Sequence, residues 1–268
     1  MLRAVGWLGH RYRVEFDWRM FRRDGLFAGN DDRRLAELDA ALRDPALRAV
    51  LVARGGHGLG RIAHLADLAA LRQHPKWIVG FSDVTALHAE LSRAGYASLH
   101  APNAAGLGRA DARTREQFVG ALENPTRPRR HDRLSCWQGG RASGPLAGGN
   151  LTVLFTSAAA GRLRLPPGCI LLLEDVTELT YRIDRMLTAL LVSGALAEVA
   201  AVAVGEFIDC PSSPHGVPVE AVLQERLSRL GVPVVAGLPF GHGIRNEPLP
   251  LGVGALVDAD RGLLAIGD

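Results

Sequence analysis

Apolar and polar positions in the first half of the chain follow strand-like and helix-like patterns in turn. Leucines at helical spacing follow Asn30, which predicts a helix over residues 31–44 with a polar N-cap. Continuous apolar runs at residues 49–53 and 77–80 predict strands buried on both faces, and residues 84–93 predict a helix. Strands that alternate with helices are typical of a parallel α/β sheet, whose ligand sites lie at the carboxyl ends of the strands.

The second half of the chain has shorter apolar runs, which are separated by glycine and proline. The runs that predict strands are residues 169–173, 200–204, 232–236 and 255–257, and residues 182–193 predict a helix. Prolines, four arginines and a glycine pair between the two halves are typical of a linker or exposed excursion. We therefore expect an α/β domain over residues 1–124, a linker over residues 125–143 and a smaller, strand-rich α+β domain over residues 144–268.

Composition narrows the class of protein. A chain of 268 residues with 47% hydrophobic and 22% charged residues is ordinary for a soluble globular protein. No apolar run approaches the roughly 18 residues of a membrane span, and the first residues do not read as a secretory signal, so we expect a cytoplasmic protein without a membrane partner. Three widely spaced cysteines argue against both a disulfide framework and a zinc site.

The net charge of +3 is carried almost wholly by arginine, since Lys76 is the single lysine among 31 basic residues. Acidic residues are interspersed throughout the chain, and the densest basic run is short and flanked by proline. This bias resembles coding composition more than a phosphate-binding face, so we expect no nucleic-acid partner.

Ser82 stands between the apolar run 77–80 and the helix predicted after it. A serine at a strand-to-helix turn has an exposed hydroxyl, and the backbone N–H groups that follow it can bind an anion. Ser82 and Asp83 would also cap the helix well. Local spacing alone favours the role of helix cap for Ser82, and the role of nucleophile stays open.

Residues 54–60, with the sequence RGGHGLG, form a glycine-rich segment before another expected helix. Glycines let the backbone approach a ligand closely, so this loop could cradle a phosphate or an oxyanion. The loop lacks the Lys and Ser/Thr of a Walker loop and does not match the dinucleotide fingerprint. By itself the pattern favours a plain tight turn.

Glu174 and Asp175 end the apolar run 170–173, where a partly buried carboxylate could orient a histidine. A polar strand end that pairs with Arg182 or Arg185 is equally consistent with this pattern.

His242 stands between two glycines in a segment rich in glycine and proline, residues 237–252. A histidine with a fixed backbone and little steric cover suits acid–base chemistry. The other eight histidines compete with it for that role.

Taken together and in this order, these segments resemble the LD-carboxypeptidase family of serine peptidases, which includes the murein tetrapeptide carboxypeptidases and the microcin C immunity peptidases. The likeness runs from about residue 25 to the C-terminus, nearly the whole chain. Each motif alone is a weak indicator of the family, but six motifs in the same order along the chain are a specific one. The matching segments are ARGGHG (53–58), GFSDVTAL (80–87), HAP (100–102), GGNL (148–151), LED with YRIDR (173–185), and GH with Asn246 and LPLG (241–252).

The resemblance implies that Ser82 is the nucleophile, that His242 is the general base and then the acid, and that Glu174 orients His242. Glu178 is the competing carboxylate, and Glu174 is preferred because it matches the acidic residue of the family's Leu-Glu-Asp motif. No cofactor and no metal are implied.

The resemblance also implies that the oxyanion hole comes from the backbone N–H groups of Asp83 and of Gly55 or Gly56. The expected fold is an N-terminal flavodoxin-like parallel sheet followed by the strand-rich C-terminal domain.

The family's usual substrate is a murein tetrapeptide, cut before its terminal D-Ala during cytoplasmic wall recycling, so a small peptide is the expected partner and a homodimer the expected assembly. A carboxypeptidase must recognise a terminal carboxylate, for which Arg54, Arg182 and Arg245 are candidates. Asn150, in the GGNL motif, is a further candidate for substrate binding.

The chain departs from the family pattern in two places. His57 replaces the tyrosine of the family's Gly-Gly-Tyr, beside the proposed oxyanion loop. The family's first strand and part of its first helix have no counterpart, so residues 2–9 are expected to lie inside that helix and residues 12–16 to form the second strand. We expect a truncated start or an N-terminal deletion, which would expose a strand edge.

Two other functions remain open from the sequence. The same three residues could cleave a peptidyl-nucleotide, as the immunity peptidases do, and Trp137 could then stack on a base. A non-catalytic protein could instead use the loop at Gly55 and Gly56 to bind a small anion.

Overall fold

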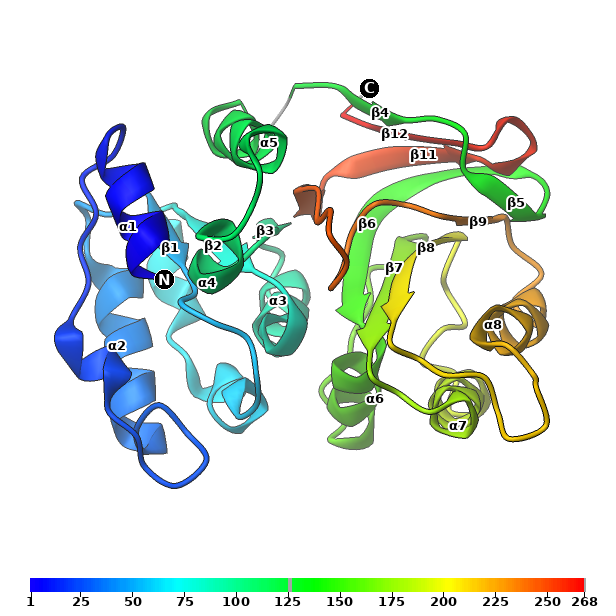
Figure 1. The fold of residues 1–268 in the computed structure, drawn as a ribbon, viewed down its shortest axis with the longest axis horizontal. Helices are drawn as coiled ribbons and strands as arrows, with labels where there is room; N and C mark the ends of the chain where they lie inside the picture. The colour runs from blue at the N-terminus through cyan, green and yellow to red at the C-terminus, as the bar shows by residue number, and fades with distance from the viewer. Residues whose placement is uncertain (125–126, 268) are drawn as a thin grey trace.

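The alternating segments of the first half form three strands of a four-stranded sheet surrounded by helices (Figure 1). The protein is described by a computed structural model over residues 1–124 and 127–267. Strands β1 (Ala49–Leu51), β2 (Trp77–Gly80) and β3 (Ser98–His100) run parallel and side by side. The helices of this half are α1 (Leu2–Gly9), α2 (Asp31–Arg43), α3 (Thr85–Arg93), α4 (Ala104–Leu107) and α5 (Ala112–Glu123).

The second half forms a larger, curled sheet of eight strands. Its order is β4 (Arg129–His131), β12 (Leu263–Ile266), β11 (Gly254–Asp258), β6 (Arg141–Asn150), β7 (Ile170–Val176), β8 (Ala201–Ile208), β9 (Val234–Ala236) and β5 (Ser135–Gln138). Strands β6 to β9 are parallel, and the strands outside them pair antiparallel. Helices α6 (Leu151–Ala159), α7 (Thr180–Val192) and α8 (Val219–Ser228) cover one face of this sheet (Figure 1).

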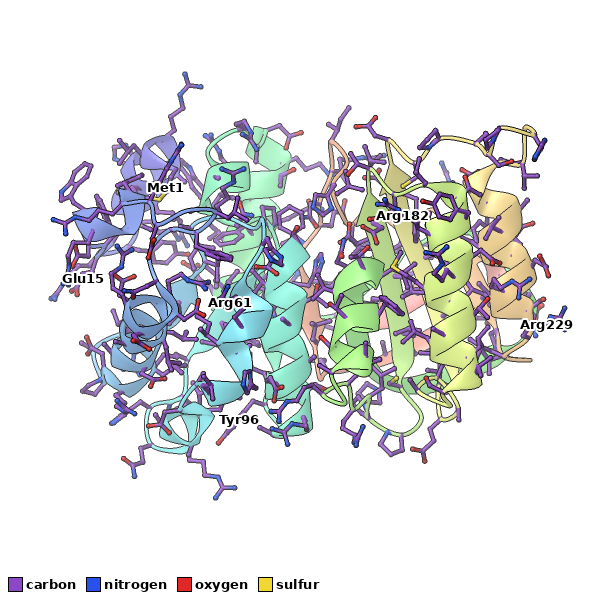
Figure 2. All side chains as sticks on the ribbon, turned by 90° about the horizontal axis from the view of Figure 1, so that it is seen from below. Met1, Glu15, Arg61, Tyr96, Arg182 and Arg229 are labelled. Carbon is purple, nitrogen blue, oxygen red and sulfur yellow. The ribbon has the colours of Figure 1, made fainter. Side chains whose placement is uncertain are left out.

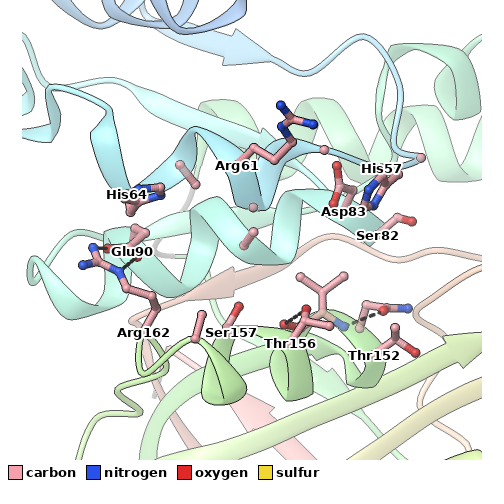
Figure 3. Close-up of a pocket in the computed structure, with 18 of the residues that line it drawn as sticks. His57, Arg61, His64, Ser82, Asp83, Glu90, Thr152, Thr156, Ser157 and Arg162 are labelled. Atoms are coloured by element: carbon pink, nitrogen blue, oxygen red, sulfur yellow. Dashed lines mark hydrogen bonds and ion pairs between the residues drawn. The ribbon is translucent and has the colours of Figure 1, made fainter. Parts of the chain in front are cut away.

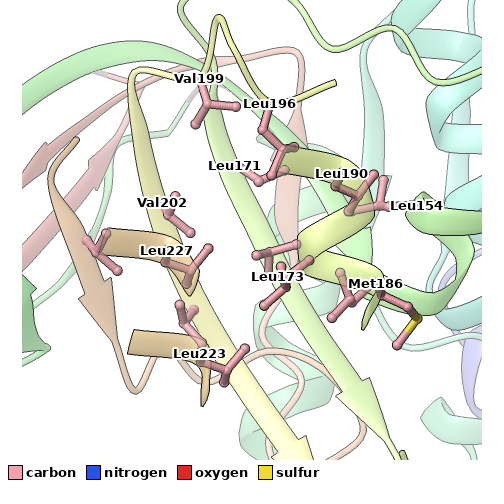
Figure 4. Packing of buried hydrophobic residues seen from close by; sticks show 14 of the residues in the cluster. Leu154, Leu171, Leu173, Met186, Leu190, Leu196, Val199, Val202, Leu223 and Leu227 are labelled. Atoms are coloured by element: carbon pink, nitrogen blue, oxygen red, sulfur yellow. The ribbon is translucent and has the colours of Figure 1, made fainter. Parts of the chain in front are cut away.

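The core of the second half lies on both faces of its sheet. Leu171, Leu173 and Val202 point toward α7 and α8, where they pack against side chains such as Leu190 and Leu223 (Figure 4). The neighbouring residues of the same strands face the opposite side and pack against β10, β11 and β12 in a second apolar cluster. A sheet buried on both faces explains why these strands read as continuous apolar runs.

One strand crosses between the two halves. Strand β10 (Leu249–Leu251) follows β9 of the eight-stranded sheet but pairs antiparallel with β3 of the four-stranded sheet. The segment that joins them, residues 237–248, is therefore held by a different sheet at each end.

The structure confirms most of the predicted elements. Helix α2 begins after Asn30, whose side chain accepts a hydrogen bond from the Arg33 N–H at 2.9 Å. The helix expected after the glycine loop was wrong: three short 3₁₀ helices stand there, η2 (Leu59–Arg61), η3 (Ala63–Leu65) and η4 (Leu68–Arg72). Each is too short to show the 3.6-residue period that a helix prediction relies on.

The second strand expected at residues 12–16 is also absent from the described structure, where these residues pair with no strand. A cavity of about 670 Å³ separates them from β1, with Val14 and Leu51 among its walls. Without a neighbouring strand the segment cannot make ladder hydrogen bonds.

Part of the expected linker is ordered as sheet. Strands β4 and β5 lie within residues 125–143, at opposite edges of the eight-stranded sheet, and residues 125–126 lie outside the described residues. Two α/β units are present, and the second, which we expected to be the smaller, carries the larger sheet. The flavodoxin-like order and the domain boundaries stay predictions. Within the described residues no helix has the length and apolar character needed to cross a membrane.

Candidate active site

Ser82 occupies a sharp turn between β2 and α3, inside the short 3₁₀ helix η5 (Ser82–Val84). Its φ of 67° is left-handed, a conformation that L-residues other than glycine rarely adopt. The side chain caps neither η5 nor α3, so the helix-cap interpretation is wrong. Strained non-glycine residues cluster at functional sites, where the surrounding structure holds them in place.

The Ser82 hydroxyl contacts a histidine from the other half of the molecule. His242 Nε2 lies 3.0 Å from Ser82 Oγ, and His242 Nδ1 lies 2.7 Å from Glu174 Oε2. A carboxylate can only accept, so Nδ1 carries the proton and donates it to Glu174. Nε2 of the neutral ring is then free to accept from the Ser82 hydroxyl. These three residues, predicted together from the sequence, form one continuous chain of hydrogen bonds.

Glu174 is fully buried within β7, at the centre of the larger sheet. The register between β7 and β8 shifts between Leu173 and Asp175, so a bulge on β8 lies opposite Glu174. Bulges beside functional sites re-aim side chains. Glu178, the competing carboxylate, lies in the loop after β7, 3.8 Å from Arg182 and without a contact to His242.

His242 is held in its loop by contacts at both ends. The Glu247 N–H donates to the Pro239 carbonyl at 2.8 Å, and the Gly241 N–H donates to Asn246 Oδ1 at 3.3 Å. These bonds close the segment between β9 and β10 into a compact loop, which fixes the imidazole between the two sheets.

The two glycines around His242 pack closely against neighbouring carboxylates. A Cβ at position 241, where φ is +120°, would lie 2.8 Å from Glu174 Oε2. A Cβ at position 243 would lie 1.5 Å from Glu206 Oε2, so the Glu206 side chain would have to move to admit it. The Gly-His-Gly pattern therefore reflects close packing against Glu174 and Glu206. Sequence reasoning missed Glu206, which stands in β8 with no motif around it.

Asn150 holds Glu174 rather than presenting a free amide to the cavity. Its buried side chain donates from Nδ2 to Glu174 Oε1 at 3.2 Å and to Asp175 Oδ1 at 2.9 Å. Its Oδ1 accepts from the Val153 N–H at 3.2 Å and so caps α6. Asp175 also accepts from the N–H and hydroxyl of Thr152, which ties α6 to the end of β7.

Burial and pairing shift the pKa values of Glu174 and His242. Burial raises the pKa of Glu174, while the hydrogen bonds from His242 and Asn150 oppose the rise. Burial acts to lower the pKa of His242, but the hydrogen bond and charge of Glu174 outweigh it, so the pKa lies above its ordinary value. A histidine with a raised pKa is a stronger base when it is neutral.

Gly55 packs directly against Ser82. A Cβ on Gly55 would lie 2.9 Å from Ser82 Cβ and 3.1 Å from Ser82 Oγ, so the glycine loop can approach the serine only without a side chain there. Among the described residues, the backbone N–H groups of Gly55, Gly56 and Asp83 have no hydrogen-bond acceptor. Free N–H groups around a nucleophile are what an oxyanion hole needs.

A cavity of about 410 Å³ opens beside Ser82 (Figure 3). Ser82, Asp83 and His57 stand at one end, and Glu90 with Arg162 stand at the other. Thr152, Thr156 and Ser157 of α6 form the opposite wall.

The arginines in the walls of this cavity are not the three expected to bind a terminal carboxylate. Arg61 and Arg162 line it, whereas Arg54, Arg182 and Arg245 do not. Figure 2 shows Arg61 and Arg182 on different halves of the molecule. Glu90 accepts from Arg162 at 2.7 and 2.8 Å. No sequence pattern singled out Arg61 or Arg162, because each reaches the cavity through the packing of separate elements.

His57, which departs from the family pattern, also lines the cavity. Its ring lies 5.8 Å from that of Phe27, which Arg34 and Arg61 also contact, at 5.0 and 4.8 Å from the ring centroid. Within residues 1–124 and 127–267, no three His, Cys, Asp or Glu side chains are placed to hold a metal ion.

Comparison with known proteins gives a consistent family. Residues 1–101 match the LD-carboxypeptidase N-terminal domain, and residues 143–257 match the LD-carboxypeptidase C-terminal domain. A murein tetrapeptide carboxypeptidase of Pseudomonas aeruginosa is 34% identical over 245 residues, which cover 87% of this chain and 80% of that protein.

Solved structures agree with this likeness. A muramoyltetrapeptide carboxypeptidase from Oxalobacter formigenes has a TM-score of 0.88 at 34% identity, over 100% of this chain and 94% of that chain. The microcin C7 self immunity protein MccF has a TM-score of 0.88 at 21% identity, over 100% of this chain and 90% of that chain, a likeness of fold.

Proposed function

Because this chain belongs to the LD-carboxypeptidase family, and is thus a serine-type carboxypeptidase, we propose that it cleaves the L,D-amide bond to the terminal D-Ala of murein tetrapeptides. The catalytic residues in this proposal are Ser82, His242 and Glu174. The observation that carries it is the hydrogen-bonded chain from Ser82 Oγ through His242 to Glu174, beside a cavity open to a peptide. The names of the relatives at 34% identity support the murein substrate.

The first half-reaction forms an acyl-enzyme. As Ser82 Oγ bonds to the scissile carbonyl carbon, its proton passes to His242 Nε2. The carbonyl oxygen becomes an oxyanion, which the N–H groups of Asp83 and of Gly55 or Gly56 stabilise. His242 then returns the proton to the leaving nitrogen, and the C–N bond breaks to release D-Ala.

The second half-reaction regenerates the serine. Water attacks the acyl carbon while His242 takes its proton, and the bond to Ser82 Oγ breaks as the proton returns to that oxygen. Glu174 keeps Nδ1 protonated and stabilises the imidazolium without itself taking the proton.

The proposal extends to the setting of the reaction. We place it in the recycling of cell-wall peptides in the cytoplasm, with the protein acting as a homodimer. Sedimentation of the purified protein tests the assembly, and a single species at the monomer mass of 28.7 kDa contradicts it.

A peptidyl-nucleotide is the alternative substrate, because MccF shares the fold. The lining of the cavity gives this substrate less support, since the flat side chains it offers a base are those of His57, His64 and Arg61. Among the described residues that line the cavity there is no Trp, Tyr or Phe to stack on a base. Trp137, the sequence candidate for this role, stands in β5 and packs against the core of the larger sheet.

The deciding experiment compares Ser82→Ala with the wild-type protein on a murein tetrapeptide, with released D-Ala measured by mass spectrometry. We expect a loss of at least about 10⁴-fold in kcat, since the nucleophile is removed. Ser92→Ala, a half-buried serine on the adjacent helix α3, is the matched control and should keep full activity.

Two further arms separate the alternatives. A peptidyl-nucleotide offered in place of the tetrapeptide should be cleaved poorly, and preferential cleavage supports the immunity-type function. A fluorophosphonate probe should label Ser82, whereas an unlabelled protein that binds small anions fits a non-catalytic role. Equal release of D-Ala by wild type and Ser82→Ala defeats the proposal.

A further inference from the structure

Asp83 follows the proposed nucleophile, and its side chain turns back toward the glycine loop. Its Oδ2 accepts a hydrogen bond from the Leu59 N–H at 2.8 Å. In Figure 3, Asp83 lies beside His57 and next to Ser82. Burial raises the pKa of this carboxyl, while the Leu59 N–H and the charges of His57 and Arg34 oppose the rise. Burying a carboxylate costs free energy unless hydrogen bonds and nearby charges offset the loss of its hydration.

The glycine loop, residues 54–60, is anchored on two sides. Behind it, Arg34 Nη1 donates to the Gly58 carbonyl at 3.1 Å, and the Phe27 ring packs so closely on Gly58 that a Cβ there would lie 2.6 Å from it. These contacts fasten the loop to residues 27–34. Among the described residues, the bond from Leu59 to Asp83 is the hydrogen bond that joins the loop to residues 81–84.

The tolerance at this junction is small. Gly55 stands so near Ser82 that a methyl group does not fit between them, and the Gly55 and Gly56 N–H groups await an acceptor. A shift of the loop by a fraction of an ångström would move these donors off the position of the oxyanion, where their effect depends on distances near 2.7–3.1 Å.

We propose that the Asp83 side chain is a positioning residue, which fixes the glycine loop against the nucleophile turn and so sets the geometry of the oxyanion hole. The inference rests on the proposed function, in which the backbone N–H of Asp83 is itself one of the oxyanion donors. A single residue thus supplies one donor through its backbone and places the other through its carboxylate.

The test compares Asp83→Ala with Asp83→Asn on the murein tetrapeptide. Asp83→Ala removes the acceptor, and kcat should fall about 10²-fold, somewhat less than the loss of a whole donor, while KM stays within about twofold. The side-chain carbonyl of Asn can accept from the Leu59 N–H, so Asp83→Asn should recover at least about tenfold of that loss.

A matched control separates this role from general loss of structure. Asp39 Oδ1 accepts from the Asp67 N–H at 2.9 Å, a link of the same kind that lies away from Ser82. Asp39→Ala should leave kcat within about twofold of wild type even where it lowers the unfolding temperature.

A transition-state probe gives a second readout. In a complex with a peptide boronic acid, Ser82 Oγ adds to boron, its proton passes to His242, and the anionic adduct occupies the oxyanion hole. Affinity for the boronic acid should fall in parallel with kcat in Asp83→Ala, while affinity for the tripeptide product stays unchanged.

Leu59→Pro tests the same bond from its donor side, and keeps the proposal testable if Asp83→Ala does not fold. Leu59 is the first residue of η2, and the change removes its N–H, but a proline also disfavours the ψ of −3° at Gly58 before it, so the double variant with Asp83→Ala measures what that distortion adds. We expect the same fall in kcat, and no further fall in the double variant with Asp83→Ala.

The proposal is overturned if the folded Asp83→Ala and Leu59→Pro variants keep kcat within about twofold of wild type, or if Asp83→Asn is as impaired as Asp83→Ala. Its failure can be told from failure of the proposed function. An active Ser82→Ala variant defeats both, whereas an inactive Ser82→Ala beside a fully active Asp83→Ala defeats this inference alone.

Discussion

The two sheets hold their parts of the candidate site by different means. Ser82 stands at the end of the four-stranded sheet, whose strand β1 pairs, among the described residues, on one side alone and faces a cavity of about 670 Å³ on the other. Glu174 stands inside β7, with a neighbouring strand on each side and an apolar cluster on each face. Glu174 is thus held by the densely packed sheet, and Ser82 by a local turn and the loops around it.

Because Glu174 is the buried partner of His242, we expect its substitution to have the largest effect on kcat among the changes compared below. Glu174→Gln keeps the volume but removes the charge that fixes the His242 tautomer, so kcat should fall on the order of 10³–10⁴-fold. The pKa of His242, now above its ordinary value because of Glu174, should fall. Activity needs the neutral imidazole, so the acid limb of kcat/KM should move to lower pH. A pH–rate profile of both proteins measures both effects.

Glu178→Gln is the matched control for that experiment. Glu178 has the same chemistry and lines the cavity beside Ser82, but it has no bond to His242. We expect kcat within about fivefold of wild type and an unmoved acid limb. A larger loss at Glu178 than at Glu174 would reverse the assignment of the orienting carboxylate.

The packing of the two sheets can be compared with one substitution made in each. Leu172 is fully buried in β7, so Leu172→Ala should cost about 3–5 kcal/mol of unfolding free energy. Leu51 in β1 is half-buried and already borders a cavity, so Leu51→Ala should cost only about 1–2 kcal/mol. Urea unfolding measures both variants. Equal losses would mean that the two sheets are equally well packed.

The sequence predicted those features that depend on neighbours along the chain. The cap at Asn30, the end of a strand at Gly80 and the carboxylate after Leu173 all follow from local patterns of residues. The positions of Ser82, Glu174 and His242 came from their order within a family resemblance, since local spacing at Ser82 favoured a helix cap.

The features that the sequence did not predict depend on packing between distant residues. Strand β10 pairs with β3 although about 150 positions separate them, and no pattern in either strand marks that partner. The amide of Asn150 donates to Glu174 and Asp175, from another strand, and no pattern around Asn150 predicts these contacts. Arg162 reaches the cavity through its bond with Glu90 on α3, and its own neighbours give no sign of this.

The smallest expected effect concerns the strain at Ser82, and it sharpens the comparison because it separates stability from activity. Ser82→Gly and Ser82→Ala both remove the hydroxyl and should both be inactive. They differ in the backbone, because a φ of 67° is strained for alanine and relaxed for glycine. Ser82→Gly should therefore be more stable than Ser82→Ala by about 1 kcal/mol.

At Ser92, within helix α3, the order of stability should reverse, since glycine is the poorer helix former by about 1 kcal/mol. Thermal unfolding of the four variants measures both differences. If Ser82→Ala were instead more stable than Ser82→Gly, as expected for alanine at Ser92, the turn would carry no strain, and Ser82 would be held by its contacts with Gly55 and His242 alone.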